Sequence, residues 1–412
     1  MNFESTHASV PLVGLASIMR SATSGGNLRE LGTLLVDRAA RDPRDANALM
    51  DLATVLQLIG DRATALAVQS QALLLQQRYV LPGCAKGDGV RLLALMGPGD
   101  VAANTPLEFL VEGTDVTLEM LYVSPHLPLP GRVPEHDVLF VAGCESDENR
   151  EFLRFVGELV IGWPRPVLNA PERIARLARD SASALLRAVR GIAMPTTFRV
   201  DRPTITRICE AGDQIDIQGE LALPIIARPV GSHAGKGLAK LDDPSAVLAY
   251  MQEQVAPEFY LSNFVDYSSR DRLFRKYRVA LIDGRPFLCH MAISSHWMIH
   301  YINAGMLESR ERRAEEEEAM ASFERGFAVR HASALADLHR RLSLEYVVID
   351  CAETQGGDLL VFEVDSGAVV HALDSVDLFP YKQQPMRRVR EAFREMLLRA
   401  VRCGDRGASG AS

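Results

Sequence analysis

Residues 342–373, LSLEYVVIDCAETQGGDLLVFEVDSGAVVHAL, predict a β-hairpin that carries three acids. An apolar, β-branched run ending at Asp350 predicts the first strand, Gly-Gly-Asp the turn, and an apolar run ending at Glu363 and Asp365 the second strand. Side chains alternate along a strand, so Glu363 and Asp365 share a face, and the hairpin can bring Asp350 beside them. Three adjacent carboxylates repel one another unless cations lie between them, and such hard oxygen ligands suit Mg²⁺. The hairpin therefore predicts a magnesium site and, through it, a nucleotide; the alternative is that the acids are solvated strand ends.

A glycine-rich turn follows an apolar strand in residues 223–238, LPIIARPVGSHAGKGL. Its glycines allow backbone amides to approach phosphate oxygens closely, and Arg228 and Lys236 can neutralise phosphate charge. The spacing is neither that of GxxxxGK[ST] nor that of GxGxxG at the start of a helix. The turn predicts phosphate contacts without either of these motifs.

The order of these segments along the chain resembles the ATP-grasp superfamily. A basic strand with its glycine-rich flap is followed by residues 259–265, which could serve as a hinge, and by an arginine-rich strand, FRKYRVALIDGRPF, with a tight Asp283-Gly284 turn. The D…E-x-D acids come last. Residues 166–197 resemble the linker and helix that enter that fold, and in all the resemblance covers about residues 90 to 400. It implies the α/β (α+β) class, with an ATP-grasp fold preceded by a small parallel-sheet domain.

The resemblance also implies where ATP would bind. Arg228 stands where the family usually has a lysine that contacts the α- and β-phosphates; its guanidinium is longer and planar, so the triphosphate would sit differently. The other residues expected to bind ATP are those of the flap and those expected to grip the adenine: Ser232, His233, Gly235, Lys236 and Gly237, then Tyr260, Leu261, Asn263 and Phe264.

The same resemblance assigns the metal ligands and the catalytic cations. Asp350 and Glu363 would hold Mg²⁺, with Glu363 bridging two ions, and Asp365 stands where many relatives have asparagine. Arg278 resembles the family arginine that contacts the transferred phosphate or the acyl-phosphate. Lys276 shares its strand face by the period of two. The alternative is that both cations are ordinary surface residues of a strand with no catalytic role.

Residues 290–306, HMAISSHWMIHYINAGM, are rich in histidine and contain no carboxylate. Relatives place an N-x-G loop here that closes over the acceptor, so we expect a substrate site. Its expected residues are His290, His296, His300, Tyr301, Asn303 and Gly305. A zinc site at His296 and His300 would have no third ligand at motif spacing. Packing of the histidines beneath a loop is the other alternative.

The resemblance implies an ATP-dependent carboxylate-amine ligase that forms an amide bond through an acyl-phosphate on a small metabolite or peptide. ATP and Mg²⁺ are the expected cofactors, and a small carboxylate and an amine are the expected substrates. Two alternatives remain at this stage. One is a non-catalytic nucleotide-binding scaffold whose helical N-terminus recruits a partner, and the other is an ATP-dependent phosphotransferase.

Length, charge and cysteine content limit the number of domains, the cellular compartment and the kinds of partner that we expect. At 412 residues it is long enough for two or three domains, and its net charge of −8 argues against a general nucleic-acid binder. Six cysteines without paired spacing predict a reducing cytoplasm, and the apolar stretches are too short or too interrupted to span a bilayer. We therefore expect a cytoplasmic protein without nucleic-acid or membrane partners, and a possible homodimer as in many relatives.

The N-terminal part differs in character. Residues 46–76 resemble one tetratricopeptide unit, with Ala53, Ala65 and Ala72 at its small-residue positions, and the preceding helical pattern supplies half a unit. Such arrays usually need three or more repeats, so these helices would pack on the catalytic body, on a second copy or on a protein partner.

These patterns predict a domain order. We expect a helical tetratricopeptide-like domain at 1–85, a parallel-sheet domain at 86–170 and an ATP-grasp domain at 171–403. The ATP-grasp domain would divide into a nucleotide-binding lobe at about 195–265 and a catalytic lobe at about 266–403. Residues 404–412, GDRGASGAS, predict a disordered tail.

Overall fold

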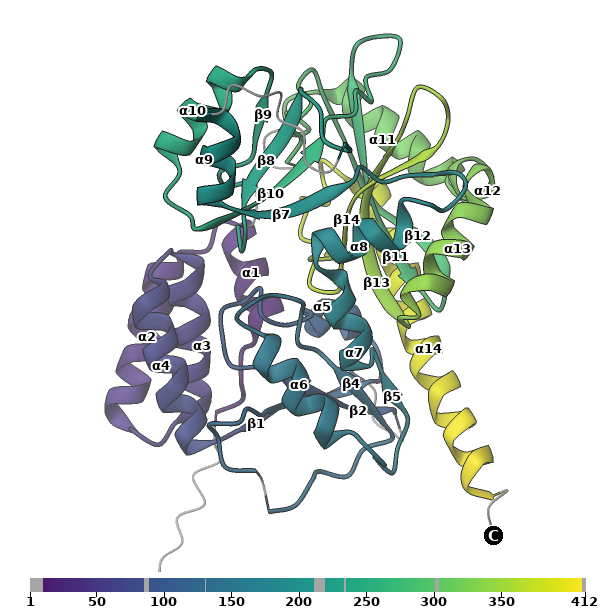
Figure 1. Ribbon diagram of the computed structural model, residues 1–412. Helices are drawn as coiled ribbons and strands as arrows, with labels where there is room; N and C mark the ends of the chain where they lie inside the picture. The colour runs from purple at the N-terminus through teal and green to yellow at the C-terminus, as the bar shows by residue number, and fades with distance from the viewer. Residues whose placement is uncertain are drawn as a thin grey trace, which may run out of the picture. The chain divides into compact units, whose positions relative to one another are not determined.

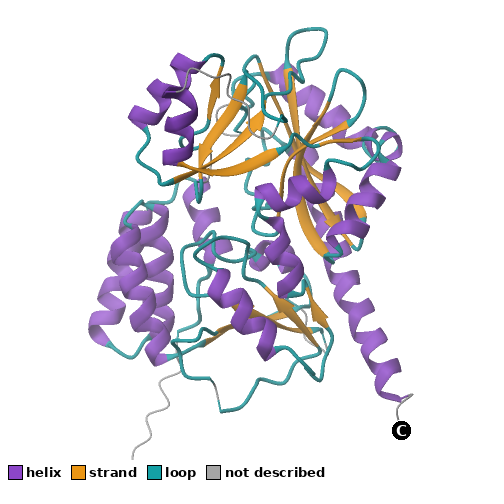
Figure 2. Cartoon of the chain, in the orientation of Figure 1, coloured by secondary structure: helices purple, strands orange, loops and turns teal. Residues whose placement is uncertain are grey.

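The computed structural model describes residues 10–84, 89–129, 131–210, 219–232, 235–300 and 304–409. The chain forms two compact units. Unit 1 comprises Met1–Cys144, Glu148–Ile174 and Ser366–Ser412, and unit 2 comprises Glu145–Asp147 and Ala175–Asp365. Each unit contains both helices and strands (Figures 1 and 2), so the predicted α/β class is confirmed. Within the described ranges, no helix is both long and apolar enough to cross a membrane.

Unit 1 begins with four helices: α1 (Leu15–Thr23), α2 (Leu28–Arg41), α3 (Ala46–Leu58) and α4 (Arg62–Leu75). Three of them start at a capping side chain, because Asn27, Asp45 and Asp61 each accept a hydrogen bond from the first turn of the helix that follows. α3 packs against both α2 and α4, and the three alanines expected at close-approach positions are buried. The helix pair expected at residues 46–76 is observed, while its assignment as a tetratricopeptide unit stays a prediction.

A five-stranded sheet follows, with the order β1-β3-β2-β4-β5. Its strands are β1 (Arg78–Leu81), β2 (Arg91–Met96), β3 (Thr117–Tyr122), β4 (Val138–Val141) and β5 (Val167–Leu168). β2 to β5 pair in parallel, as expected for the small parallel-sheet domain, and β1 pairs antiparallel with β3. The helices α5 (Leu107–Val111), α6 (Arg150–Leu159) and α7 (Pro171–Ile174) belong to this part of the chain. Because β1 hydrogen-bonds to β3, it belongs to the sheet and not to the helical domain predicted to extend to residue 85.

The C-terminal helix α14 (Gln383–Ser409) follows a short 3₁₀ turn, η3 (Pro380–Lys382), and packs against α5 and β4. Arg390 lies 3.1 Å from Glu112, Arg394 lies 2.5 Å from Asp115, and the ring of Phe393 contacts that of Phe140. These contacts attach the helix to unit 1.

Two predictions about the C-terminal part are therefore corrected. The catalytic lobe was expected to extend to residue 403, whereas everything after Asp365 groups with unit 1. The tail was expected to be disordered from Gly404, whereas α14 continues to Ser409. Glycine weakens a helix by about 1 kcal/mol, but propagation is cooperative and no proline follows Pro385 in the first turn, so the helix continues. Residues 410–412 lie outside the described ranges.

The first sheet of unit 2 is antiparallel, with the order β7-β10-β8-β9. Its strands are β7 (Thr197–Asp201), β8 (Ile225–Pro229), β9 (Ala239–Leu241) and β10 (Glu258–Asn263), and the helices α9 (Arg202–Glu210) and α10 (Pro244–Glu253) belong with it. Phe259 and Leu261 of β10 lie in the core beneath the sheet. Side chains alternate, so Tyr260 takes the other face, where it stands opposite Arg228 of β8. The segment expected to serve as a hinge is thus mainly a strand paired on both sides.

The second sheet of unit 2 has the order β12-β11-β13-β14-β6. Its strands are β6 (Ile192–Ala193), β11 (Phe274–Ile282), β12 (Arg285–Ser294), β13 (Tyr346–Glu353) and β14 (Leu359–Asp365). Both predicted hairpins are confirmed, because β13 pairs antiparallel with β14 and β11 with β12. Asp283 and Gly284 have φ values of 47° and 74°, which are typical of a type I′ hairpin turn. β13 lies between β11 and β14 and is buried along nearly its whole length, which explains its continuous apolar sequence.

The remaining helices of unit 2 are α8 (Arg179–Leu186), α11 (Arg310–Ser322), α12 (Phe327–Arg330) and α13 (Ala332–Leu342), together with the 3₁₀ turn η1 (Ala175–Leu177). α8 packs against β7 and β14, and therefore contacts both sheets of the unit. This position brings Arg179, the first residue of α8, to Glu363 of the β13-β14 hairpin.

Candidate functional site

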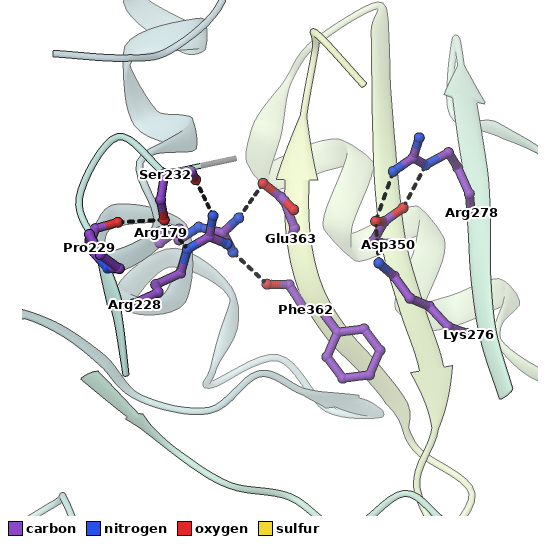
Figure 3. A network of polar contacts seen from close by, with 9 residues as sticks. All are labelled: Arg179, Arg228, Pro229, Ser232, Lys276, Arg278, Asp350, Phe362 and Glu363. Atoms are coloured by element: carbon purple, nitrogen blue, oxygen red, sulfur yellow. Dashed lines mark hydrogen bonds and ion pairs between the residues drawn. The ribbon is translucent and has the colours of Figure 1, made fainter. Parts of the chain in front are cut away.

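Asp350 is the centre of a buried ion-pair group in the second sheet of unit 2. Arg278 stands directly opposite it on β11, and Lys276 lies two residues earlier on the same face. The Arg278 guanidinium donates from Nε to Oδ1 over 2.8 Å and from a terminal nitrogen to Oδ2 over 3.0 Å, and Lys276 Nζ lies 2.7 Å from Oδ2 (Figure 3). The two cations share a strand face, as the period of two predicts, and both pair with the one carboxylate of Asp350.

The electrostatics of this group favour an ionised Asp350. Burial by itself raises the pKa of this carboxyl, since only 5% of Asp350 is exposed, but the charges of Arg278 and Lys276 outweigh burial and lower the pKa well below its ordinary value. Burial also opposes the charge of Arg278, yet Asp350 raises the pKa of that arginine overall. Asp350 and Arg278 are therefore both charged at neutral pH.

Glu363 stands opposite Asp350 across the β13-β14 pair, where the strand register is irregular. Its carboxylate accepts a hydrogen bond from Arg179, the first residue of α8, and Arg179 also donates to the carbonyl oxygen of Phe362 (Figure 3). Burial raises the pKa of Glu363, but Arg179 and Arg228 together hold it below its ordinary value. Glu363 is therefore also ionised at neutral pH.

Arg228 occupies a different electrostatic position from the other cations. Its guanidinium donates to Oγ and to the carbonyl oxygen of Ser232, in its own turn. Throughout the described part of the chain, no carboxylate forms an ion pair with it. Burial and the like charge of Arg179 lower the pKa of Arg228 to about 10. A charged side chain in this position is costly unless an anion joins it.

The cluster as a whole carries more positive than negative charge. We define the basic cluster as Arg179, Arg228, Lys276 and Arg278 (Figure 3). Its four cations face the two carboxylates of Asp350 and Glu363, and adding the neighbouring Asp365 still leaves one more cation than acid. Buried charges are normally paired, so the surplus predicts an anionic ligand, and a guanidinium with free donors matches phosphate geometry.

Three glycines of the glycine-rich flap adopt left-handed backbone conformations. Gly231, Gly235 and Gly237 have positive φ values of 74°, 74° and 68°. At Gly237 an added Cβ would lie 2.8 Å from the Pro229 ring, so both the backbone angle and the space require glycine there. Tyr250 donates a hydrogen bond to the carbonyl oxygen of Gly237 over 2.7 Å, which anchors the end of the flap to α10.

The residues expected around the adenine do not all face the same side of the sheet. Leu261 is buried in the core on the opposite face of the sheet from Tyr260, so its side chain is not available to a nucleotide. Asn263 braces the preceding segment, because its side chain accepts from the backbone of Ala222 over 2.9 Å and donates to the carbonyl of Glu220 over 2.8 Å. Strand alternation turns the Leu261 side chain into the core, so only its backbone could contact a nucleotide, and its predicted binding role stays a prediction.

An aromatic corner lies at the end of β10. The Phe264 ring contacts Trp297 edge-on with 5.8 Å between centroids, and Lys240 Nζ lies 4.7 Å from the centroid of the Phe264 ring. The flap residue Lys236 is exposed, and no ion pair of its side chain is found within the described ranges. The contact between Phe264 and Trp297 joins the predicted adenine segment to the predicted substrate segment.

The structure brings two of the predicted substrate histidines towards the basic cluster. His290 stands opposite Arg278 on β12. Burial, Lys276 and Arg278 together lower the pKa of His300, which places its imidazole in the electrostatic field of these cations. His300 is therefore neutral at pH 7.

The other predicted substrate and flap residues are less informative. His296 is exposed. Gly305 has a φ of 64°, and an added Cβ there would lie 2.7 Å from Arg312 Nη1, so the structure places it beside α11. His233, Tyr301 and Asn303 lie outside the described ranges.

The metal prediction is tested by the donors present. Among the residues that the structure describes, no three His, Cys, Asp or Glu side chains converge as a metal site, so Asp350, Glu363 and Asp365 do not form the expected three-ligand cluster. Asp350 and Glu363 instead form ion pairs with different cations. However, Mg²⁺ is usually bound by one or two carboxylates together with phosphate oxygens and water. Asp350 and Glu363 are ionised, face each other and keep unused lone pairs, so they fit such a two-carboxylate site.

Arg179 is the site residue that sequence reasoning missed. It lies 184 residues before Glu363, within the segment 166–197 that resembles a linker and helix. Nothing local distinguishes it from the neighbouring arginines of that segment. Only the packing of α8 against β14 brings it to the acid.

Comparison with known protein families and with curated proteins found no match. Among solved structures, the chain is similar to the VanG D-Ala:D-Ser ligase from Enterococcus faecalis, with 12% identity, a TM-score of 0.46, and coverage of 76% of this chain and 100% of that one. It is similar to a RimK domain ATP-grasp protein from Sphaerobacter thermophilus, with 17% identity, a TM-score of 0.38, and coverage of 74% and 99%. It is also similar to the ATP-grasp ligase PsnB in complex with precursor peptide PsnA2 and AMPPNP, with 14% identity, a TM-score of 0.40, and coverage of 77% and 99%. Two of these three are described as ATP-grasp proteins.

Proposed function

We propose that the chain is an ATP-dependent carboxylate-amine ligase whose nucleotide site is the basic cluster beneath the glycine-rich flap. The observation that carries this proposal is the surplus positive charge, with a partly buried Arg228 that has no carboxylate partner in the described part of the chain. A triphosphate supplies the negative charge that this arrangement needs. The carboxylate and the amine are taken to be those of a small metabolite or a peptide.

The chain's own residues would act through position and charge. Arg228 would exchange its hydrogen bonds with Ser232 for phosphate oxygens, and the flap backbone would cover them. Arg278 and Lys276, held rigidly by Asp350, would offset the negative charge that develops as the terminal phosphoryl group moves to a substrate carboxylate. Mg²⁺, held by Asp350 and Glu363, would add to this charge stabilisation when bound.

The second half-reaction needs a base. The amine must lose a proton when it attacks the acyl-phosphate, so that amide forms and phosphate leaves. A neutral His300 can accept that proton, because burial and the neighbouring cations lower its pKa and keep it unprotonated. We therefore expect His300→Gln to slow amide formation while ATP-dependent activation of the carboxylate persists.

The proposal is tested by incubating the protein with Mg-ATP and pools of amino acids and small carboxylates while ADP is measured. Glu363→Gln removes a charge from the site and should abolish substrate-dependent ADP. Glu353→Gln is the matched control, since Glu353 lies in the same hairpin but pairs with Arg330 and His331. Its ADP release should equal that of the wild type.

Hydroxylamine identifies the activated species. A ligase that forms an acyl-phosphate yields a hydroxamate, whereas a phosphotransferase with a stable product yields none. ADP release that persists unchanged in Glu363→Gln, or the absence of any Mg-ATP binding, would contradict the assignment of the site.

A further inference from the structure

A cavity of about 70 Å³ lies within unit 1, far along the chain from the basic cluster. Residues of α3, α4, the turn before α1, and the ends of β2 and β3 line it. One buried water needs about 10–15 Å³ of such space, so the cavity is several times larger than a single water requires. Its size suits a small organic molecule.

Two acids face this cavity. Asp51 of α3 is 1% exposed and accepts hydrogen bonds from the backbone of Val13 over 2.9 Å and of Gly14 over 3.0 Å. Glu108 of α5 accepts from the backbone of Ala16 over 2.9 Å. Both acids therefore hold the first turn of α1, which explains part of their hydrogen-bonding capacity. An ionised carboxylate has about four acceptor positions, so capacity remains on each.

Neither acid forms an ion pair within the residues that the structure describes: Arg38 lowers the pKa of Asp51 only through its charge, and its hydrogen bonds go to Asp45. Burial is the largest influence on both, and it raises the pKa of Asp51 to about 6 and that of Glu108 to about 7. Unpaired buried carboxylates are unusual, because the desolvation cost is normally offset by a cation. Asp51 is fully buried and Glu108 is half-buried on the same cavity, which indicates that a positive group is missing.

Two buried hydroxyl groups point to the same conclusion independently. Tyr79 and Thr105 both line the cavity, and they are 1% and 0% exposed. Within the described ranges neither hydroxyl oxygen has a hydrogen-bond partner. A buried hydroxyl without a partner is destabilising, so a ligand that supplies the missing hydrogen bonds would relieve this cost.

We propose that this cavity is a binding site for a small primary ammonium ion. The three N–H donors of an ammonium group match Asp51, Glu108 and a hydroxyl oxygen. The apolar remainder of the wall includes Met96 and Met120, which suits a short hydrocarbon chain. A bare inorganic cation would leave most of the volume unfilled.

Calorimetric titration of the full-length protein with methylammonium and ethylammonium tests this site. At about pH 8.5 both carboxylates would be ionised. We expect saturable binding, and weaker binding of ethanol, a neutral molecule of matching size. Tyr79→Phe and Thr105→Val should each raise Kd about three- to tenfold through one lost hydrogen bond, and Asp51→Asn should raise it tenfold or more.

The hydroxyl variants also distinguish a loss of binding from a loss of folding. Each removes a group without a partner in the described structure, so the unliganded variants should melt at or above the wild-type temperature while binding ammonium less tightly. Ser366→Ala is the matched control, because its buried hydroxyl has no partner in the described residues and does not line this cavity. Its Kd should be unchanged.

Three results would overturn the proposal. They are the absence of saturable binding up to about 100 mM ammonium probe, a Kd that is the same in both hydroxyl variants as in the wild type, and ethanol binding as tight as that of ethylammonium. Any of them would leave the cavity as a water-filled space around the start of α1.

Discussion

Replacing Arg228 with methionine should separate the stability of the protein from its affinity for nucleotide. The arginine has an ordinary pKa of 12.5 that burial and Arg179 lower to about 10, a difference equivalent to about 3 kcal/mol against the charged form. Both values lie above 7, so the guanidinium is charged in the folded and unfolded states and the whole cost applies at neutral pH. Because the side chain is only partly buried, water screens some of it, and about 1–2 kcal/mol remains.

The same substitution removes the hydrogen bonds to Ser232, which offsets about 1 kcal/mol of the gain. The unliganded Arg228→Met protein should therefore be as stable as the wild type or more stable by up to about 1 kcal/mol, a rise of about 2–4 °C in Tm for a unit of this size. Mg-ATP affinity should fall about 10- to 150-fold, the value of one charge-assisted hydrogen-bonding group.

Calorimetric melting of the unliganded protein and titration with Mg-ATP measure the two quantities. Arg199→Met is the contrasting control. Arg199 lies in the same sheet but pairs with Asp147 and Glu258, so its loss leaves two acids without that partner and should lower Tm. A loss of more than about 2 kcal/mol in unliganded Arg228→Met, together with a Kd for Mg-ATP within twofold of wild type, would refute the reasoning.

Three further outcomes follow from other contacts. Arg278→Met should lower the free energy of unfolding by about 3–5 kcal/mol and abolish ADP release, because it leaves Asp350 buried with one fewer cation. Urea unfolding and the ADP assay measure the two effects, and a variant as stable as the wild type would contradict the pairing. Gly237→Ala should lower Tm and Mg-ATP affinity more than Gly231→Ala does, because only the first adds a clash to the positive φ; equal losses would show that the backbone angle alone matters. Asp51 has a folded pKa of about 6 against 3.8 ordinarily, so its proton is held more tightly in the folded state and stability falls as pH rises through this window. The stability of the wild type relative to Asp51→Asn should thus fall by up to about 3 kcal/mol between about pH 4 and pH 7 in urea unfolding, and a difference that does not change with pH would contradict a raised pKa.

Local patterns were sufficient for the hairpins and for the cations on β11. The β-branched run before Asp350 and the Asp283-Gly284 turn specify strands and a reversal through short-range sterics, and the period of two places Lys276 and Arg278 on one face.

Boundaries and partners required the tertiary structure. α14 belongs to unit 1 because Arg390 and Arg394 find acids there, about 280 residues earlier in the chain, and no local pattern encodes that pairing. The N-terminal cavity exists only where helices meet strand ends.

The sequence by itself determined the two hairpins and the acids and cations that they carry, since these depend on alternation and turn chemistry over a few residues. Only the tertiary structure decided which cation each acid takes. It pairs Glu363 with Arg179, gives Asp350 both Arg278 and Lys276, and leaves Arg228 without a carboxylate among the described residues. The physical reason is that ion pairing depends on distance and burial, which the packing of α8 and the two sheets sets, and not on separation along the chain.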